Sequence, residues 1–264
     1  MKKITFFMFS CLLCISPVSL LRSSEGAYLT ESQIREIFTK HVQVNYTEEY
    51  KNRHLRLPRM KKTGSWSWEG KDFSRVIALL EFERFISEKQ IFAHKALAIE
   101  GYYADAGYDP ECFLLPHDRL DVTTYQTNPA EHDLHNLILD QHDYDFVMAN
   151  QVLEHVYDPI RCLKNIHKHM RVGGILYINV PANNLPHEIT YHYYTGFTPL
   201  GLGSVVQAAG FEILSIGQWG NYEYLNLLFQ TYGWPDYRAL KNPGLNDIRH
   251  PVITWIFAVK RGEI

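Results

Sequence analysis

The sequence predicts an α/β protein built on a mostly parallel sheet. Three features predict it: unbroken apolar runs typical of strands covered on both faces, a helical repeat between two of them, and polar residues directly after a strand. The run from Phe146 to Ala149 is apolar without alternation, and Asn150, Gln151, Glu154 and His155 follow it at once. In open α/β sheets, ligands bind just past the carboxyl ends of such strands. We therefore expect this loop to form part of a binding site.

Two more strands are predicted upstream. The first runs from Ala96 to Glu100, and the segment after it, Gly101 to Gly107, contains Tyr102 and Tyr103. Glycine in such a segment lets a ligand approach the backbone closely. The second strand is predicted from Asp121 to Tyr125.

Downstream of His155, the helix and strand alternate again. Apolar residues recur at helical spacing over 160–170, and the pair Gly173-Gly174 is expected to end that helix in a tight turn. A buried strand is then predicted over 175–180, and Pro181 is expected to stop it because proline cannot donate to a sheet ladder.

The last part of the chain is predicted to add one helix and two strands. Thr198 is expected to cap the helix with Pro199 at its first position, and Gly210 to end it. The two strands are predicted over 211–216 and 252–260.

Three stretches of this chain resemble the class I S-adenosylmethionine-dependent methyltransferases. They read YDFV…LEHV from Tyr144, RVGGILYINVP from Arg171 and FTPLGL…AAGFEI from Phe197. The resemblance covers roughly residues 94–261 and is most specific from Tyr144 to Gly217. It implies a Rossmann-like, seven-stranded, mostly parallel sheet with helices on both faces and an antiparallel last strand.

The resemblance also implies S-adenosylmethionine as the methyl donor. The positions that correspond to the donor site of the family are Glu100, Gly101, Tyr102, Gln126, Asp133, Leu134, Asn150 and Gln151. The glycine-rich loop of the family departs from its usual form here, because tyrosines stand where small residues are usual. Either a tyrosine face attracts the sulfonium cation of the donor, or these tyrosines pack in an altered loop. Gln126 stands near the place of a family acid that binds ribose hydroxyls.

Methyl transfer is an in-line displacement that requires a well-placed acceptor, and a base when the acceptor is a hydroxyl. His192 and His187, in the loop after the strand over 175–180, are the preferred candidates for this base. His155 is the third candidate, and it is expected to orient its loop rather than to transfer a proton. Tyrosines 191, 193 and 194 lie beside the two preferred histidines and predict an aromatic-walled acceptor pocket.

Composition excludes several other classes of function. The net charge is −3 without a basic stripe, so no nucleic-acid partner is expected. The four cysteines are too isolated for a disulfide framework. The histidine pairs His132/His135 and His167/His169 lack a matching ligand set, so no metal site is expected.

The chain is predicted to have three parts. Residues 1–26 combine basic residues, an apolar run and small residues, in the order of a secretory signal peptide, and the apolar run is alternatively a membrane anchor. Residues 27–92 form a helical extension and residues 93–264 the methyltransferase-like domain. The expected location is the secretory pathway or a membrane, or the cytoplasm if the N-terminus is not a signal. Nothing in the sequence specifies an oligomeric state.

The expected function is transfer of a methyl group to a small-molecule or saccharide-like acceptor. The alternative is a scaffold or binding protein that has kept the fold without the activity, which the altered donor loop favours.

Overall fold

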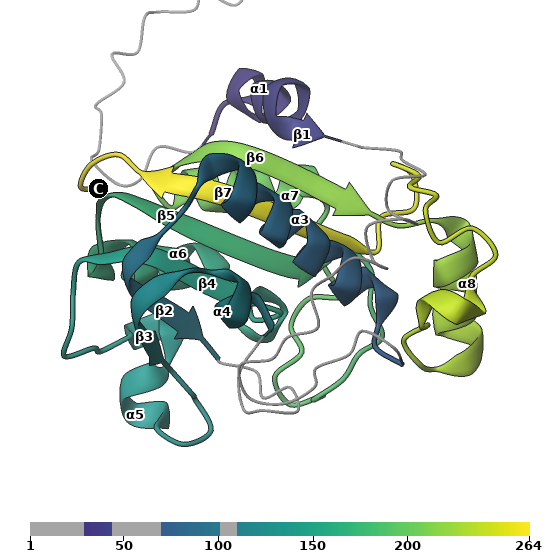
Figure 1. Ribbon diagram of the computed structural model, residues 1–264, viewed down its shortest axis with the longest axis horizontal. Helices are drawn as coiled ribbons and strands as arrows, with labels where there is room; N and C mark the ends of the chain where they lie inside the picture. Colours follow the sequence, from purple (N-terminus) through teal and green to yellow (C-terminus); the bar gives the residue numbers. More distant parts are fainter. Residues whose placement is uncertain (1–28, 44–69, 101–109) are drawn as a thin grey trace, which may run out of the picture.

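The computed structural model describes residues 29–43, 70–100 and 110–264, and a seven-stranded sheet runs through the middle of it (Figure 1). In chain order the strands are β1 (Val42–Gln43), β2 (Ala93–Ile99), β3 (His117–Val122), β4 (Tyr144–Asn150), β5 (Met170–Pro181), β6 (Phe211–Trp219) and β7 (Ile253–Lys260). Their order across the sheet is β1-β6-β7-β5-β4-β2-β3. β7 runs antiparallel to its neighbours β5 and β6, and the other pairs are parallel. The predicted fold class is confirmed.

The seventh strand does not come from the predicted domain. Residues 93–264 supply six strands, and the two-residue β1 from the preceding segment pairs with β6 at the edge. Between β3 and β4 the chain forms only the short helices α5 (Pro129–His132) and η2 (Leu134–Asn136). That stretch is mostly polar, so it cannot supply a strand that is buried on both faces.

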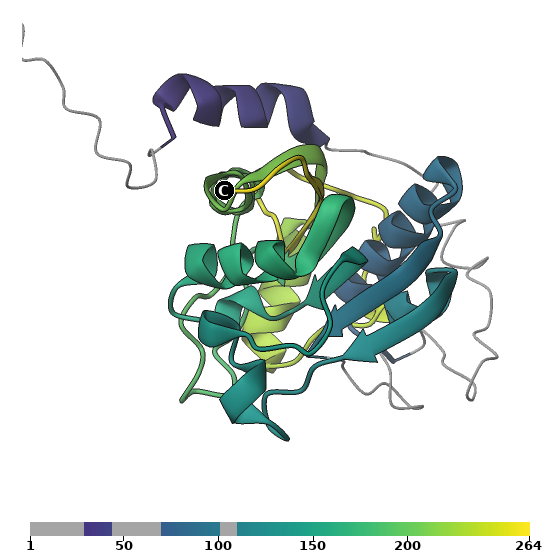
Figure 2. The ribbon, with the colours of Figure 1, turned by 90° about the vertical axis from the view of Figure 1, so that its left-hand side faces the viewer.

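Helices cover both faces of the sheet (Figure 2). The helices α6 (Pro159–His169) and α7 (Pro199–Ala208) pack on one face, and α3 (Phe73–Lys89), α4 (Pro110–Leu114) and α8 (Tyr222–Thr231) pack on the other. The helix α1 (Glu31–His41) lies beside α7 and β6. Two single turns, η3 (Leu153–His155) and η4 (Tyr237–Ala239), are the remaining helical elements of the described residues.

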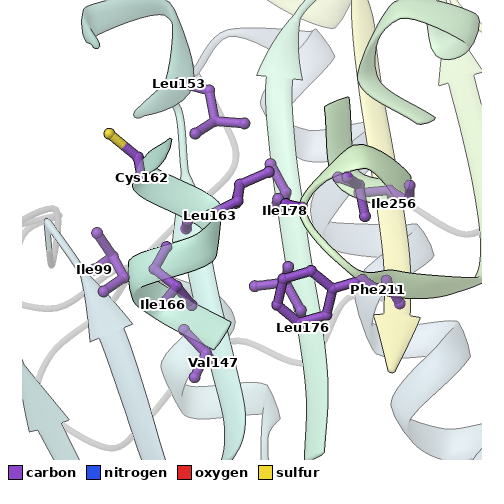
Figure 3. Packing of buried hydrophobic residues seen from close by; sticks show 14 of the residues in the cluster. Ile99, Val147, Leu153, Cys162, Leu163, Ile166, Leu176, Ile178, Phe211 and Ile256 are labelled. Carbon is purple, nitrogen blue, oxygen red and sulfur yellow. The ribbon is translucent and has the colours of Figure 1, made fainter. Parts of the chain in front are cut away.

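The face under α6 shows how the apolar repeat builds the core (Figure 3). Leu163 and Ile166 are fully buried and face the sheet, where Val147 and Leu176 are also fully buried. Burying one such side chain contributes about 1.5–3 kcal/mol. The helical spacing read from the sequence thus corresponds to the stripe that joins α6 to β4 and β5.

Two predicted boundaries are wrong. The helix α6 ends at His169, and β5 begins at Met170, so Gly173 and Gly174 lie within the strand. They belong to a bulge: Tyr144 pairs with Met170 and Phe146 with Ile175, so five steps along β5 lie opposite two steps along β4. Gly173 has a φ of 83°, and a Cβ on Gly174 would come within 2.9 Å of the Tyr144 carbonyl oxygen, so the glycines serve close strand approach rather than a helix end.

The second wrong prediction concerns both ends of β3, which runs from His117 to Val122 instead of from Asp121 to Tyr125. Tyr125 and Gln126 lie in the turn that follows, and both are exposed. The β-branched and aromatic residues of that stretch favour a strand locally. The sheet decides otherwise, because the last residue of β2 that pairs with β3 is Ala98, opposite Val122.

The predicted start and end of α7 are confirmed. The Thr198 hydroxyl accepts a hydrogen bond from the Gly201 N–H, Pro199 occupies the first turn, and Gly210 has a φ of 92° after the helix. Within the predicted helical extension, α3 spans Phe73–Lys89.

Some predictions lie outside the described residues. They are the signal or anchor at 1–26 and the donor-site residues Gly101 and Tyr102. Within the described ranges, no helix is long and apolar enough to cross a membrane.

Candidate active site

The strand order places a crevice between β2 and β4. From β2 the chain first adds β3 on one side and then returns to add β4 on the other. Open α/β sheets bind ligands at the carboxyl ends of the two strands that flank such a reversal. Ile99 of β2 pairs with Ala149 of β4, so Glu100 and Asn150 emerge together at this edge.

A buried amide network holds the end of β4 against β5. The Asn179 side-chain amide donates to Asn150 Oδ1 at 2.8 Å, and its oxygen accepts from Gln151 Nε2 at 2.8 Å. The Gln151 N–H also donates to the Asn179 carbonyl at 2.8 Å. Asn150 and Asn179 are almost completely buried, so their positions are fixed before any ligand arrives.

Backbone strain gathers at the same edge. Three of the six described non-glycine residues with positive φ lie here: Glu100 and Gln151 directly after β2 and β4, with φ values of 50° and 55°, and Glu188 in the loop after β5, with 47°. For residues with a Cβ this conformation costs of the order of 1 kcal/mol each, and such residues cluster at functional sites. The strain supports the assignment of this edge as the site.

Glu100 joins the ends of β2 and β3. Its carboxylate oxygen Oε1 accepts a hydrogen bond from the Tyr125 N–H at 2.6 Å, and its own N–H donates to the Thr123 hydroxyl at 3.2 Å. Burial raises the pKa of Glu100 to about 7, opposed by the hydrogen bond from Tyr125 and assisted by the negative charge of Glu188. A ligand that donates hydrogen bonds or carries positive charge stabilises the ionised form of such a desolvated carboxyl group.

The structure brings the three candidate bases together. His155 in η3 and His187 and His192 in the loop after β5 each offer one ring nitrogen, and these three atoms lie within 4.8 Å of one another. The ring centroids are 4.7–5.5 Å apart. Two main-chain hydrogen bonds fix this arrangement, because the Glu154 carbonyl accepts from the N–H groups of Tyr193 and Tyr194 at 2.9 and 3.2 Å. We call these residues the carboxyl-edge histidines.

The surroundings of His155 and His192 favour the neutral ring. Burial lowers the pKa of His155 and of His192, and the other members of the cluster lower it further. The His155 Nδ1 lies 3.3 Å from the Tyr191 carbonyl and the His187 Nδ1 3.0 Å from the Leu185 carbonyl. A carbonyl oxygen only accepts, so both Nδ1 atoms carry the proton and both Nε2 atoms carry the free lone pair.

Glu154 lies directly behind this cluster. Its side chain is fully buried, and neither carboxyl oxygen has a hydrogen-bond partner within the described part of the chain. Burial raises the pKa of Glu154 to about 8, against the smaller opposing influence of Arg75. The Oε1 atom is 3.9 Å from His155 Nε2. A buried carboxyl group without partners is costly, and a bound cation or donor would relieve that cost.

Exposed aromatic side chains surround the histidines. They come from four different loops at this edge and include Tyr125, Tyr157, Tyr191, Tyr193 and Trp234. Trp234 packs edge-on against His187, with ring centroids 5.8 Å apart, and Tyr191 lies against Tyr125 at 6.3 Å. The predicted aromatic wall therefore extends beyond the tyrosines of the loop after β5. We call these five residues the aromatic rim.

The other predicted donor residues lie in the loops beside this edge. Asp133 caps η2 and accepts from the His135 N–H at 2.9 Å, while Leu134 is buried against the core under α6. Gln126 lies exposed in the turn after β3, four residues past the end of the strand, so its position depends on that turn rather than on the sheet.

Sequence reasoning missed several residues of the site, among them Asn179, Tyr157, Glu188 and Trp234. Glu188 is exposed in the loop after β5, and its charge raises the pKa of both Glu100 and Glu154, so it links the end of β2 to the histidines. Its position next to His187 was a visible signal. Trp234 follows α8 and is close only in space, so the sequence offered no signal for it.

A family model described as a methyltransferase domain matches residues 81–216, just over half of the chain. The chain belongs to this methyltransferase family. The S-adenosylmethionine-dependent methyltransferase predicted from the sequence is thereby confirmed as the family and the class of enzyme. The matched residues run from within α3 to within β6 and include every described residue of the site except Trp234.

Several solved structures are similar to this methyltransferase at low sequence identity. They include the N-methyltransferase NodS from Bradyrhizobium japonicum WM9 in complex with S-adenosyl-L-homocysteine, which is 14% identical with a TM-score of 0.46 over 83% of this chain and 100% of its own. A putative methyltransferase from Bacillus halodurans C-125 is 11% identical with a TM-score of 0.45, over 70% of this chain and 99% of its own. A putative sarcosine dimethylglycine methyltransferase from Galdieria sulphuraria is 11% identical with a TM-score of 0.42, over 70% and 87%. No curated protein sequence matches the chain.

The residues at the edge of the sheet fit the methyl donor of the family. Glu100 offers a desolvated carboxyl group at the end of β2, and the fixed end of β4 lies next to it. A sulfonium donor carries an amino group and ribose hydroxyls, which are the kinds of donor that such a carboxyl group accepts.

Proposed function

We propose that this methyltransferase transfers a methyl group to a small-molecule or saccharide-like acceptor bound over the carboxyl-edge histidines. One observation carries the proposal. The three histidines that the sequence singled out one by one come together beside Glu100, at the edge where the strand order places a ligand site. S-adenosylmethionine supplies the methyl group, whose carbon is bonded to the sulfonium sulfur.

In this proposal, Glu100 and the ends of β2 and β4 hold the donor, and the histidines hold the acceptor. The Nε2 lone pair of a neutral histidine accepts the proton of an acceptor hydroxyl, for which a lowered pKa keeps the ring in the basic form at neutral pH. His192 suits this role because neither ring nitrogen has a hydrogen-bond partner among the described residues. His155 has its Nδ1 committed to a main-chain carbonyl and acts by orientation.

The aromatic rim supports the class of acceptor. Exposed tyrosine and tryptophan rings offer apolar faces with polar edges, which suit the apolar faces and hydroxyls of a sugar-like ring. The net charge of −3 gives no support to a nucleic-acid acceptor.

The alternative function is a scaffold that has kept the fold without binding donor. One observation favours it: the side chains of Asn150 and Gln151 are engaged by Asn179, so they are not free to turn toward a ligand. Donor binding separates the two functions.

The test is calorimetric titration of the full chain with S-adenosylmethionine. We expect binding in the wild type and at least a tenfold loss in Glu100→Gln, which removes the charge and keeps the shape. Asp118→Asn is the matched control, because Asp118 makes the same change of charge at the opposite end of β3. Absence of donor binding in the wild type favours the scaffold. Equal binding by the wild type and Glu100→Gln removes Glu100 from the donor site.

Turnover is then measured as formation of S-adenosylhomocysteine over a panel of hydroxylated small molecules and saccharides. We expect saccharide-like compounds to be the best acceptors. A preference for amines or for nucleic acid would replace this acceptor class.

For location, we propose export or membrane anchoring through residues 1–26. The support is the order of basic, apolar and small residues in that segment. Intact-mass measurement of the protein from its native source tests it. A mass lower by about 26 residues indicates a removed signal peptide, and a full mass in the membrane fraction indicates an anchor. A full-length soluble protein in the cytoplasm contradicts both.

A further inference from the structure

We propose that the carboxyl-edge histidines, His155, His187 and His192, form a binding site for one divalent transition-metal ion. No metal site is predicted from the sequence, since the pairs His132/His135 and His167/His169 have no matching ligands. The structure instead gathers three histidines that are 32 and 37 residues apart in the chain. Each offers one ring nitrogen, and the three atoms lie within 4.8 Å of one another.

The hydrogen bonds of the rings have the pattern of metal ligands. A metal-binding histidine donates its second N–H to a carbonyl or a carboxylate, which fixes the ring and its tautomer. His187 does so to the Leu185 carbonyl at 3.0 Å, and His155 to the Tyr191 carbonyl at 3.3 Å. The Nε2 atoms of both rings therefore keep their lone pairs for a ligand.

His192 supplies the strongest single observation. Both of its ring nitrogens are shielded from solvent, and neither has a hydrogen-bond partner in the described ranges. A polar atom that is buried without a partner costs about 1–3 kcal/mol. Coordination of a metal ion by either nitrogen removes this cost.

The dimensions and surrounding charge fit a cation. Tetrahedral Zn²⁺ binds histidine nitrogens at about 2.0–2.1 Å, which places two ligand nitrogens about 3.3 Å apart. Small rotations of the three rings close the present separation. The exposed Glu188 next to His187 adds negative charge, and the fully buried Glu154 carboxyl group places further oxygen atoms close by, with Oε1 3.9 Å from His155 Nε2.

Three imidazoles and no thiolate define the class of metal. This ligand set suits Zn²⁺, Co²⁺, Ni²⁺ or Fe²⁺, and three protein ligands leave a fourth position open.

The metal deepens the proposed function, and this part of the inference rests on it. An acceptor hydroxyl at the open position binds the metal through its oxygen, which lowers the pKa of the hydroxyl and releases its proton to solvent. The oxygen lone pair then forms the bond to the methyl carbon, the carbon–sulfur bond breaks, and the donor leaves as a neutral thioether. The histidines act through the metal in this scheme rather than as bases.

The experiment titrates the full chain, stripped with a chelator, with Zn²⁺ in a calorimeter. The same titration with Co²⁺ is followed by visible absorption, since the ligand-field bands report the coordination geometry. We expect one ion per chain and a tetrahedral Co²⁺ spectrum. His187→Ala and His192→Ala should each weaken Zn²⁺ binding at least about 100-fold.

His142→Ala is the matched control. His142 is an exposed histidine stacked on His169 at the other edge of the sheet, so its removal should leave Zn²⁺ affinity unchanged. Circular dichroism confirms that each variant is folded. For the wild type alone, Zn²⁺ should raise the melting temperature, because an ion that binds the folded state stabilises it by mass action.

Equal Zn²⁺ affinity in the wild type, His187→Ala and His192→Ala overturns the site. An equal loss in His142→Ala shows unspecific histidine binding and overturns it too. Donor binding is measured separately. Zn²⁺ binding without donor binding supports the metal site and contradicts the proposed methyl transfer. Donor binding without Zn²⁺ binding supports the proposed function and contradicts the metal site.

Discussion

Two groups of histidines lie at opposite edges of the same sheet, and they differ in how their nitrogens are used. At the amino edge, His169 at the end of α6 and His142 before β4 stack at 4.7 Å with nearly parallel rings. The His169 Nδ1 contacts the His142 Nδ1 at 2.9 Å, and its Nε2 contacts the Leu137 carbonyl at 3.2 Å. At the carboxyl edge, both nitrogens of His192 have no partner in the described part of the structure.

The two groups differ in the partners of their ring nitrogens and in whether several rings converge on one point. In the amino-edge pair, the ring nitrogens of His169 contact His142 and the Leu137 carbonyl, which joins α6 to the loop before β4. The carboxyl-edge histidines keep capacity free at the edge where strained residues and a buried, unpartnered carboxyl group also lie. His167, near the amino edge, also has two buried ring nitrogens without a partner among the described residues, so an unpartnered nitrogen does not by itself mark a ligand site. The carboxyl-edge histidines differ because three rings converge there beside an unpartnered carboxyl group.

The largest expected effect is a loss of methyl-transfer activity that occurs in a carboxyl-edge histidine variant and not in an amino-edge variant. His192→Phe should lower methyl transfer at least about 100-fold, because a base or metal ligand at the reacting hydroxyl contributes at least that much. It should leave the melting temperature nearly unchanged. His169→Phe should keep most of the activity and lower the melting temperature, since it removes two contacts that join α6 to its neighbours. Turnover and thermal unfolding of both variants check this, and equal losses of activity would show that the edges do not differ in role.

The next effect concerns the support of the carboxyl edge. Asn179→Leu should lower the free energy of unfolding by about 2–4 kcal/mol, because it leaves the buried Asn150 oxygen without its donor and overfills the site. Donor affinity should fall with it. Urea unfolding measures the change. Asn226→Ala on the exposed side of α8 is the control, and a loss of similar size there would contradict the role of the network.

A pH effect is expected from a third histidine near the amino edge, His167. Burial lowers the pKa of His167 to about 4, and the positive charge of Lys260 adds to this against the smaller influence of Glu263. Between pH 6.5 and 4 the unfolded chain binds the proton more readily than the folded chain, so stability falls as the pH falls through this window. The total loss should be at most about 3 kcal/mol, since each pKa unit between 6.5 and about 4 corresponds to about 1.36 kcal/mol.

Thermal or urea unfolding at several pH values measures it. His167→Phe cannot be protonated there, so its stability curve should be flatter between pH 6.5 and 4 than that of the wild type. Identical pH profiles in the two proteins would show that His167 does not contribute.

The smallest expected effect tests the anchor of the loop that carries His187 and His192. Thr198→Ala removes the hydroxyl that caps α7 at the end of this loop, and it should cost about 1 kcal/mol of stability. Zn²⁺ affinity should stay unchanged, because the cap lies outside the cluster. Replacement by serine should restore the stability, and failure of serine to do so would rule out the cap as the cause.

Local patterns predicted most of the elements correctly. The continuous apolar run of β4, the helical repeat of α6 and the cap of α7 are signals carried by neighbouring residues, and the structure confirms each of them. The end of β3 and the place of Gly173 were predicted wrongly. Both depend on which residues of the next strand remain available for pairing, which the local sequence does not encode.

By itself, the sequence determined the α/β class, the family resemblance and the loop after β4 as a candidate site. Periodicity and composition act over a few residues, so a single chain displays them directly. The tertiary structure decided that His155, His187 and His192 meet, that Glu154 lies buried behind them without a partner, and that Trp234 joins the rim. These contacts join loops from separate strands, and only the parallel order of β2, β4 and β5 brings the loops to one edge. The sequence shows where the histidines stand in the chain, whereas the fold determines which partners their ring nitrogens have.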